Sequence, residues 1–490
     1  MDMELFGLSP LYVGAIVLSL ALLWRLLRGF SNPLSKIPGP WYSRWTDLVP
    51  KYYRLKGRLP AYVHSLHQKY GSVVRISPFE VDVADPASAQ IIYRVHKEFL
   101  KSSFYKDFAP TVTSVFSTTD VEIHRRHRKL LSSPISESGL KRFMPQIEAK
   151  VRLAIDRMGE ESRNRGAVDI FKWCIFMTTD VIGELTFGES FRMLDLGQKN
   201  QYSRDLEVLG FLGGMRVTFP FLTQLALNSV PIPFIKGVVA TTRRVQAYAT
   251  ESLQRHQDLV DNDSEKPSYT VFSKMYKAQD EETLTPIEIR DNAQTFIVAG
   301  SDTTANTLTY LIWSVCRHPK IKATLLKELR TLPEDFSDDN LKALPYLAQT
   351  IDETLRLYSV VPSGLPRVVP EGGATLGGYF IPENYTVLTQ SYTLHRNPEA
   401  FPDPDIFEPS RWENPTKLMK DSYMPFGGGS RICIGLHLAK IELRLATARF
   451  FLAYPSARVS EKEGMSDSDM KPDLYFLLSP SGHRCLIETS

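Results

Sequence analysis

The longest uninterrupted apolar run in the chain lies near its N-terminus. Leu5 to Trp24 contains no charged residue, and as a helix it would measure about 30 Å, enough for one bilayer crossing. Acidic residues precede the run and basic residues, beginning with Arg25, follow it, which predicts a cytoplasmic location for the rest of the chain. A cleaved signal peptide is the alternative, but no basic residue precedes the run and no small-residue cleavage site follows it. We therefore expect a retained membrane anchor over residues 1–24.

A basic and proline-rich segment follows the apolar run. Pro33 and the sequence Ile37-Pro38-Gly39-Pro40 end any helix and stiffen the backbone. We therefore divide the chain into an anchor (1–24), a hinge (25–45) and one large catalytic domain (46–490).

Strand-like alternation within the large domain is confined to short pieces. Val73–Ser77 and Glu80–Asp85 predict a hairpin with Ser-Pro at its turn. Near the C-terminus, Leu474–Leu478 and Cys485–Ile487 predict a second hairpin, joined through Pro480-Ser481-Gly482. We expect one more strand over residues 361–367. Helical periodicity dominates elsewhere, including residues 141–260, so the predicted fold class is mainly α with a small β region.

The clearest helix start is Thr285-Pro286-Ile287-Glu288. Thr285 can cap the helix, proline suits its first position, and Glu288 completes a capping box. We expect this helix to run to about Arg317, before a His-Pro pair. In its middle, Ala299–Thr304 brings Gly, Asp and Thr into an apolar stretch, where each is a poor choice. The Thr303 hydroxyl can also bond back to the carbonyl of Ala299. This local conflict indicates a functional site; a polar patch on an exposed face is the alternative.

Composition narrows the functional class. Hydrophobic residues make up 43% of the chain, which is typical of a globular protein with a sizeable core. The net charge of +3, from 58 basic and 55 acidic residues, does not suggest a nucleic-acid binder. The cysteines contain no close pair, so no disulfide framework is indicated; they are Cys174, Cys316, Cys433 and Cys485.

One cysteine follows a glycine-rich loop, in the sequence Phe426-Gly-Gly-Gly-Ser-Arg-Ile-Cys433-Ile-Gly435. Glycines allow the backbone to approach something flat and bulky. A sulfur just before a helix N-terminus is expected to favour the thiolate, the form that ligates a soft metal. One sulfur does not make a four-ligand zinc site, whereas haem iron needs only this one. The alternative is a small buried hydrophobic residue in an ordinary tight loop.

The motif Phe426-x-x-Gly429-x-Arg431-x-Cys433-x-Gly435, continued by Leu438-Ala439-x-x-Glu442, resembles the cysteine loop of the cytochrome P450 family of haem-thiolate monooxygenases. Three further family motifs occur upstream in the expected order. They are the His124/Arg128 pair, the segment Ala299–Thr304, and Glu353-x-x-Arg356 with the later Phe407-Glu408-Pro409-Ser410-Arg411-Trp412. In the family, the side chains corresponding to Glu353, Arg356 and Arg411 form a buried structural network.

The resemblance implies roles for individual residues. Cys433 would be the axial ligand of the iron of haem b. His124, Arg128 and Arg367 would hold the haem propionates. Asp302 would be the relay carboxylate and Thr303 the proton donor in the splitting of dioxygen. Further cofactor-binding positions implied by the motifs are Arg431, Phe426, Gly435, Ala299 and Gly300, the last two leaving room for oxygen.

The resemblance also implies partners. Electrons would come from NADPH through a separate NADPH–cytochrome P450 reductase, with cytochrome b5 as a second candidate donor, because this chain has no flavin or nicotinamide segment. The basic residues around Arg125 and Arg126, with Lys440 and Arg444, would form a positive face that suits an acidic electron donor. The predicted location is the endoplasmic reticulum membrane, with a single crossing and a cytoplasmic catalytic domain.

The expected substrate is a lipophilic small molecule that is hydroxylated or epoxidised. His124 resembles the residue of fungal secondary-metabolism members, which suggests a terpenoid or polyketide. Three regions are expected near the substrate: the Phe-rich segment 101–121, the proline-interrupted segment 217–235, and the tip of the C-terminal hairpin. A redox-independent isomerase or lyase and a non-catalytic haem-binding protein remain as alternatives, and the Asp302-Thr303 pair argues against both.

Overall fold

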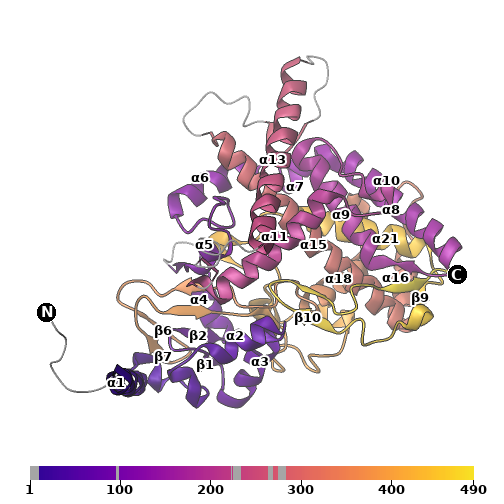
Figure 1. Ribbon diagram of the computed structural model, residues 1–490. Helices are drawn as coiled ribbons and strands as arrows, with labels where there is room; N and C mark the ends of the chain where they lie inside the picture. Colours follow the sequence, from indigo (N-terminus) through magenta and orange to yellow (C-terminus); the bar gives the residue numbers. More distant parts are fainter. Residues whose placement is uncertain (1–9, 95–98, 222, 225–232, 263–268, 274–282) are drawn as a thin grey trace.

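Helix α15 (Pro286–Arg317) crosses the middle of the helical part of the molecule (Figure 1). The computed structural model describes residues 10–94, 99–221, 223–224, 233–262, 269–273 and 283–490. The other described helices are α1 (Pro10–Phe30), α2 (Leu48–Leu55), α3 (Leu59–Tyr70), α4 (Pro86–Ile92), α5 (Phe104–Phe108), α6 (Val121–Ser132), α7 (Glu137–Leu140), α8 (Met144–Arg165), α9 (Ile170–Phe187), α10 (Met193–Leu196), α11 (Gln201–Thr218), α13 (Pro233–Asn262), α16 (Pro319–Leu329), α17 (Asp338–Lys342), α18 (Pro345–Leu357), α19 (Ser391–Leu394), α20 (Lys417–Ser422) and α21 (Leu436–Ala453).

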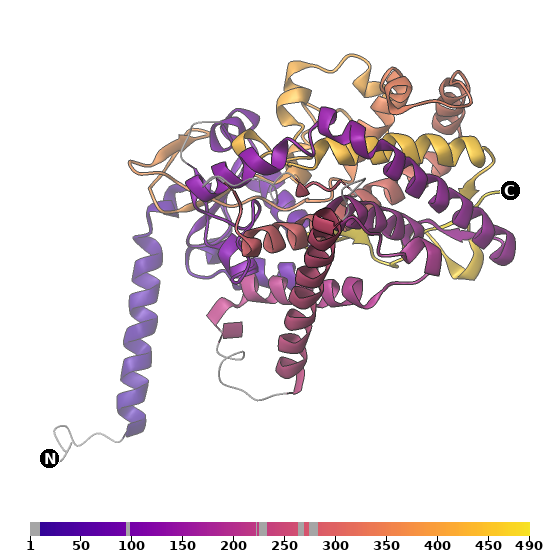
Figure 2. The same cartoon turned by 90° about the horizontal axis from the view of Figure 1, so that it is seen from above.

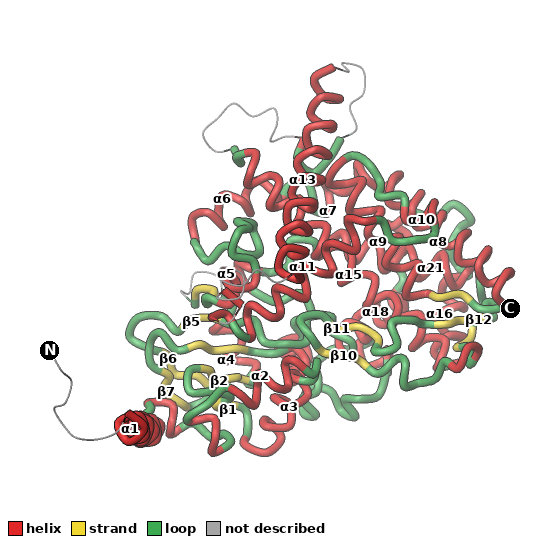
Figure 3. Tube along the Cα trace, viewed as in Figure 1, coloured by secondary structure: helices red, strands yellow, loops and turns green. Residues whose placement is uncertain are grey.

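The strands are short and form separate small sheets (Figure 3). The largest has the order β1-β2-β8-β5-β3, in which only the β2–β8 pair is parallel. The strands are β1 (Val73–Arg75), β2 (Glu80–Val83), β3 (Leu100–Lys101), β4 (Val168–Asp169), β5 (Arg367–Val368), β6 (Ala374–Leu376), β7 (Tyr379–Ile381), β8 (Thr386–Leu388), β9 (Arg458–Val459), β10 (Pro472–Leu474), β11 (Leu478–Pro480) and β12 (Leu486–Glu488). The predicted fold class, mainly α with a small β region, is confirmed.

The start and end of α15 agree with the sequence-based prediction. The Thr285 hydroxyl accepts from the backbone N–H of Glu288, and the Glu288 carboxylate accepts from the N–H of Thr285 at 2.9 Å, so the capping box is present. The helix ends at Arg317, before His318. Its inner turns are buried in the main hydrophobic core together with residues of α8, α9, α18 and α21. This packing places α15 against α21, the helix that follows the cysteine loop.

The structure describes the predicted membrane anchor only in part. The described helix α1 stands away from the rest of the molecule (Figure 2). The first residues of the predicted span, 5–9, lie outside the described residues, and the last turns of α1 include Arg25 and Arg28, which are costly in hydrocarbon. Among the residues that the structure describes, no helix is long and apolar enough to cross a membrane. The single crossing and the endoplasmic reticulum location thus gain no support from this structure.

The proline-rich segment after α1 is attached to the large sheet rather than free of it. The buried Arg75 guanidinium of β1 donates to the backbone oxygens of Leu34 (2.8 Å), Ile37 (2.9 Å) and Pro40 (3.4 Å). Asn32 donates from its side chain to Pro78 O at 2.9 Å. The segment between α1 and β1 is therefore fixed largely by hydrogen bonds from one buried arginine.

The C-terminal strands pair differently from the prediction. Leu474–Leu478 is not one strand, because β10 and β11 pair with each other and residues 475–477 form the turn between them. Strand β12 instead pairs with β4 and β9. The predicted pairing through Pro480-Ser481-Gly482 is therefore wrong, and the tip of the hairpin is Tyr475-Phe476-Leu477. Leu474 and Leu478 are buried, whereas Tyr475 is exposed and Phe476 and Leu477 are half-buried, a pattern that a short apolar run cannot reveal from its sequence.

Three further predictions have mixed outcomes. The hairpin of β1 and β2 is confirmed, with Val74 opposite Asp82. The strand expected over residues 361–367 is reduced to β5, which begins only at Arg367. The segment 217–235 runs from the end of α11 to the start of α13, and its residues 222 and 225–232 fall outside the described residues.

Candidate active site

Cys433 lies between a short 3-10 turn, η5 (Gly429–Arg431), and α21, whose N-cap is Gly435. The Cys433 N–H donates to Phe426 O at 2.9 Å, which closes the loop. Cys433 is exposed, whereas Cys174, Cys316 and Cys485 are buried. The loop therefore presents one accessible sulfur at the start of a long helix.

Glycine at position 429 is required by packing. Its φ is +63°, and a Cβ there would lie 1.6 Å from Tyr93 O. Gly429 therefore serves a different purpose from the expected close approach to a flat ligand. It lets the cysteine loop pack directly on the backbone of Tyr93.

The protonation of Cys433 differs from the sequence-based prediction. The surrounding protein desolvates the sulfur and raises the pKa of the thiol, although the Gly435 backbone N–H and the Arg128 guanidinium act in the opposite direction. The prediction that the helix N-terminus alone favours the thiolate is wrong in its net direction, because desolvation outweighs it. A coordinating metal would supply the missing stabilisation of the thiolate.

Basic side chains converge beside this loop from separate elements. In the large sheet, Lys101 of β3 lies directly opposite Arg367 of β5. Burial, Arg367 and then Arg431 lower the pKa of Lys101 well below its usual value. Burial, Arg367 and then Arg128 lower the pKa of Arg431 to about 10. We call the group Lys101, His124, Arg128, Arg367 and Arg431 the cationic cluster.

Helix α6 supplies the remaining members of the cationic cluster. Burial lowers the pKa of His124 to about 3, and Arg431, Lys101 and Arg128 add to the shift. Arg128, one turn later, donates to the backbone oxygen of Ile432, the residue before Cys433. The structure thus brings His124, Arg128, Arg367 and Arg431 together, as their predicted shared role requires.

Within the described part of the chain, no member of the cationic cluster forms an ion pair with a carboxylate, although the charge of Asp120 acts against the lowering of the Arg431 pKa. The hydrogen bonds of its members go to neutral oxygens, including Arg367 to the Tyr105 hydroxyl at 2.9 Å and Arg431 to Thr118 O at 3.3 Å. Buried cations without counter-ions are costly and like charges directly opposite in a sheet repel, which is why Lys101 and His124 are held toward their neutral forms beside the arginines. A ligand with two carboxylates would favour the charged forms of these side chains, so the residues fit a haem, which carries two propionates beside its iron.

Sequence reasoning missed Lys101 and Tyr105. Lys101 is 8% exposed, donates to Phe116 O, and has its Nζ 4.1 Å from the Tyr105 ring centroid. A lysine is seldom buried, and only the pairing of β3 with β5 reveals that this one faces Arg367.

The segment Ala299–Thr304 of α15 ends beside α21, the helix that starts at the cysteine loop. The Thr303 hydroxyl donates to Ala299 O at 2.7 Å, as predicted. Ala299 is exposed although it lies in the middle of a helix that is otherwise largely buried. The absent side chain of Gly300 points instead at Ile182 of α9, whose atoms would lie 3.0–3.4 Å from a Cβ. Glycine at 300 therefore permits close packing of α15 on α9.

Asp302 faces a different neighbour from Thr303. Burial raises the pKa of Asp302 to about 6, Glu207 of α11 adds to this effect, and Lys199 opposes it. Lys199 and Glu207 are paired with each other at the surface. A carboxyl with this pKa can both hold and release a proton near neutral pH.

Helices α15 and α21 meet next to these groups. Burial raises the pKa of the Glu442 carboxyl of α21 well above its usual value, and Thr304 of α15 acts against this shift through a hydrogen bond. The contact fixes the turn after Thr303 relative to the helix that starts at the cysteine loop.

The predicted Glu353 network is confirmed. Two nitrogens of the fully buried Arg356 donate to the two Glu353 carboxylate oxygens at 2.8 Å each. The same carboxylate accepts from Arg411 Nε and Trp412 Nε1 at 3.0 Å each, and from the N–H of Glu408 at 2.9 Å. These contacts tie α18 to the 3-10 turn η4 (Pro409–Trp412).

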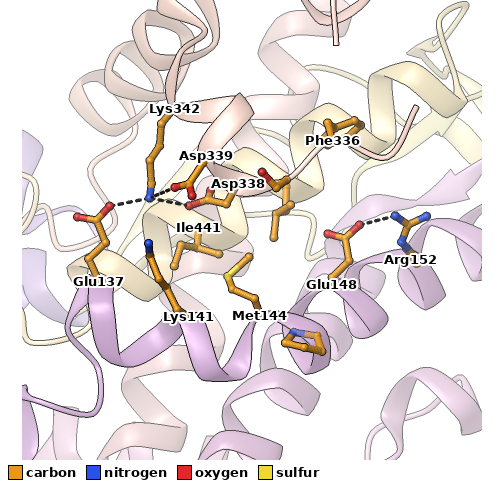
Figure 4. A pocket seen from close by; sticks show the side chains of 13 residues that line it. Glu137, Lys141, Met144, Glu148, Arg152, Phe336, Asp338, Asp339, Lys342 and Ile441 are labelled. Carbon is orange, nitrogen blue, oxygen red and sulfur yellow. Dashed lines mark hydrogen bonds and ion pairs between the residues drawn. The ribbon is translucent and has the colours of Figure 1, made fainter. Parts of the chain in front are cut away.

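A separate pocket of about 400 Å³ lies against another face of α21 (Figure 4). Its rim charges are paired within the protein, as Lys342 with Glu137 and Glu148 with Arg152 show. Beside it, Arg444 makes two hydrogen bonds of 2.8 Å to Asp338 and is largely buried. Arg444 therefore does not contribute a free charge to the predicted positive face.

The other members of the predicted positive face are also engaged. Arg125 pairs with Glu122, and Arg126 pairs with Glu288. Lys440 lies 3.9 Å from Asp352. The positive face is accordingly weaker than its sequence suggests.

Comparison with known proteins agrees with this arrangement. A family model described as Cytochrome P450 matches residues 38–486. The cytochrome P450 monooxygenase tazI of Aspergillus terreus is 49% identical over 476 residues, which cover 96% of this chain and 97% of that protein. Orf2 of Aspergillus niger is 42% identical over 96% of each chain, and stcB of Emericella nidulans is 33% identical over 94% of this chain and 89% of that protein; both are named cytochrome P450 monooxygenases. The chain therefore belongs to the cytochrome P450 family, which implies a haem iron, and it is a monooxygenase.

Proposed function

We propose that this chain is a haem-thiolate monooxygenase that hydroxylates or epoxidises a lipophilic small molecule of fungal secondary metabolism. Its electrons come from NADPH through a separate reductase, with cytochrome b5 as a further candidate donor. The observation that carries the proposal is the accessible Cys433 next to a cationic cluster that forms no ion pair with a carboxylate among the described residues. The terpenoid or polyketide nature of the substrate rests on the resemblance of His124 to fungal members.

The residues of this chain divide the binding of haem between them. Cys433 ligates the iron, and Arg128 stabilises the negative charge of its sulfur. Lys101, His124, Arg367 and Arg431 hold the propionates, which restores the charge balance of the cationic cluster. When bound, the haem supplies the binding and reductive activation of dioxygen.

Protons reach the reaction through α15. Thr303 holds a hydroxyl proton in a hydrogen bond to Ala299 O, and Asp302 resupplies it from the side of α11. Near neutral pH the Asp302 carboxyl exists in both protonation states, as a relay requires. Ala299 is the accessible position of this turn and leaves space above the site.

The decisive experiment is an absorption spectrum of the dithionite-reduced, haem-loaded protein with and without carbon monoxide. We expect a strongly red-shifted Soret band, lost in Cys433→Ala but kept in Cys174→Ala, whose cysteine is buried elsewhere. A band at the usual histidine-ligated position in the wild-type protein would refute the ligand assignment.

Turnover distinguishes the remaining functions. Reductase-dependent consumption of NADPH is expected for a monooxygenase and not for an isomerase, lyase or haem carrier. Thr303→Ala should keep the haem and divert reducing equivalents to peroxide. Tightly coupled turnover in that variant would contradict the proton route.

A further inference from the structure

Four phenylalanine side chains from three separate segments form one aromatic cluster. Phe104 and Phe108 belong to α5, Phe116 precedes α6, and Phe476 is the tip of the β10–β11 hairpin. Ring centroids lie 6.3 Å apart for Phe104–Phe108, 6.4 Å for Phe104–Phe476 and 5.1 Å for Phe108–Phe476. We call these four residues the aromatic cluster.

The rings have a regular arrangement. The planes of Phe104, Phe108 and Phe476 differ by only 18–34°. Phe116 stands nearly perpendicular to this group, at 78° to Phe108 and 73° to Phe476. Aromatic rings attract one another both when stacked with an offset and when edge meets face. A flat ring that enters beside this cluster can therefore be stacked on one side and met edge-on at the other.

The cluster is only partly covered by protein. All four rings are half-buried, whereas phenylalanines of the core, such as Phe272, Phe450 and Phe451, are less than 2% exposed. Phe108 is seated on α11, where a Cβ at Gly213 would lie 2.9 Å from its ring. The apolar surface that remains free is available to a ligand.

The aromatic cluster borders the cationic cluster. Lys101 donates to Phe116 O, and its Nζ lies 4.7 Å from the Phe116 ring centroid. The neighbouring Val115 N–H donates to the Asn292 side chain of α15 at 2.9 Å. Phe116 is thus fixed between α15 and the group that would hold the propionates, so the aromatic cluster and the cationic cluster share a boundary.

We propose that the aromatic cluster selects a planar, conjugated part of the substrate over a saturated part of the same size. This inference rests on the proposed function and narrows its substrate class to molecules with an aromatic or conjugated ring. A saturated ring would gain only from the burial of apolar area, whereas a flat conjugated ring would also gain the aromatic interaction.

The test compares two probes with one carbon skeleton, 2-naphthol and trans-decahydro-2-naphthol, by equilibrium dialysis against the haem-loaded full-length protein. The wild-type protein should prefer 2-naphthol after correction for the partition of each probe into octanol. Phe476→Leu should weaken 2-naphthol binding by roughly two- to tenfold, the range for one aromatic pair, and change the binding of the saturated probe less than about twofold. Phe380→Leu is the matched control, because Phe380 is 60% exposed on β7 and outside the aromatic cluster.

Two results would overturn the inference. One is a wild-type protein with no preference for 2-naphthol, a result that needs no variant. The other is an equal loss of affinity for both probes in Phe476→Leu, which would mean that Phe476 contributes only non-specific apolar contact. If Phe476→Leu does not retain haem, Phe108→Leu replaces it. The carbon monoxide spectrum distinguishes a failure of the proposed function from a failure of this inference. An abnormal spectrum refutes the proposed function, whereas a normal spectrum with no preference for 2-naphthol refutes only the substrate class.

Discussion

Replacing Glu353 by glutamine tests the buried network that ties α18 to the 3-10 turn η4. The Glu353 carboxylate is fully buried and accepts five hydrogen bonds, two of them from Arg356. In Glu353→Gln, an amide N–H₂ would face these donors, and Arg356 would keep its charge with no carboxylate beside it. Removing one partner of a buried pair costs about 3–5 kcal/mol, because the remaining charge stays desolvated. This is a large fraction of the roughly 5–15 kcal/mol by which folded proteins are stable.

The chain offers a control with the same spacing. Glu122 and Arg125 form another Glu-x-x-Arg pair on a helix, with side chains 72% and 77% exposed. Because exposed pairs are worth about 0–1 kcal/mol, Glu122→Gln should leave stability nearly unchanged. Burial, rather than the sequence motif, is thus the variable under test.

Urea unfolding, followed by tryptophan fluorescence and by the haem absorption, provides the measurement. We expect a clearly lower midpoint for Glu353→Gln and a midpoint near that of the wild-type protein for Glu122→Gln. Early loss of haem should accompany the first variant, because Trp412 and Arg411 are no longer held by the carboxylate. Equal midpoints for the two variants would refute the reasoning that the network carries stability.

Three further changes test other parts of the site. Gly429→Ala should destabilise the protein far more than Gly378→Ala, since both glycines have positive φ but only the first would place a Cβ 1.6 Å from a backbone oxygen of Tyr93; similar urea midpoints would contradict this. Lys101→Met should stabilise the haem-free protein but weaken its affinity for haem about tenfold or more, as measured by haem transfer to apomyoglobin. If the variant gained both stability and haem affinity, or lost both, propionate binding by Lys101 would be contradicted. Because the pKa of Asp302 is raised to about 6, the protonated carboxyl stabilises the fold below about pH 4, and this contribution is lost as the pH rises through 6. Asp302→Asn should therefore be more stable than the wild-type protein by about 3 kcal/mol above pH 6. Parallel curves of unfolding free energy against pH for the two proteins would count against the pKa shift.

Features with strong local signals could be predicted from the sequence. The limits of α15 follow from the Thr285 capping box and from the proline after His318, and both are correct. The bond from the Thr303 hydroxyl to Ala299 O follows from helix geometry. The role of Glu353 depended on resemblance, because a Glu-x-x-Arg spacing alone does not distinguish it from the exposed Glu122 pair.

Features that depend on contacts between distant segments could not be predicted. The place of Lys101 is set by the pairing of β3 with β5, strands of two residues each that leave no periodic pattern. Whether the pKa of Cys433 is raised or lowered depends on how strongly the surrounding protein desolvates its sulfur. The helix dipole alone predicts a lowered pKa, whereas desolvation raises it. The turn at Phe476 has no glycine or proline within it, so its sequence resembles one continuous strand.

The segment before α6 connects cofactor binding with substrate selection. Tyr105 accepts from Arg367 and lies 5.5 Å from the Phe116 ring, so its hydroxyl serves the cationic cluster while its ring packs on the aromatic cluster. Phe116 does the same, because its carbonyl oxygen accepts from Lys101 while its ring lies beside Phe476. An anion that binds the cationic cluster would therefore fix the same short segment that presents the aromatic rings. Because each residue takes part in both clusters, we expect the site for a flat substrate to be fully formed only when haem is bound.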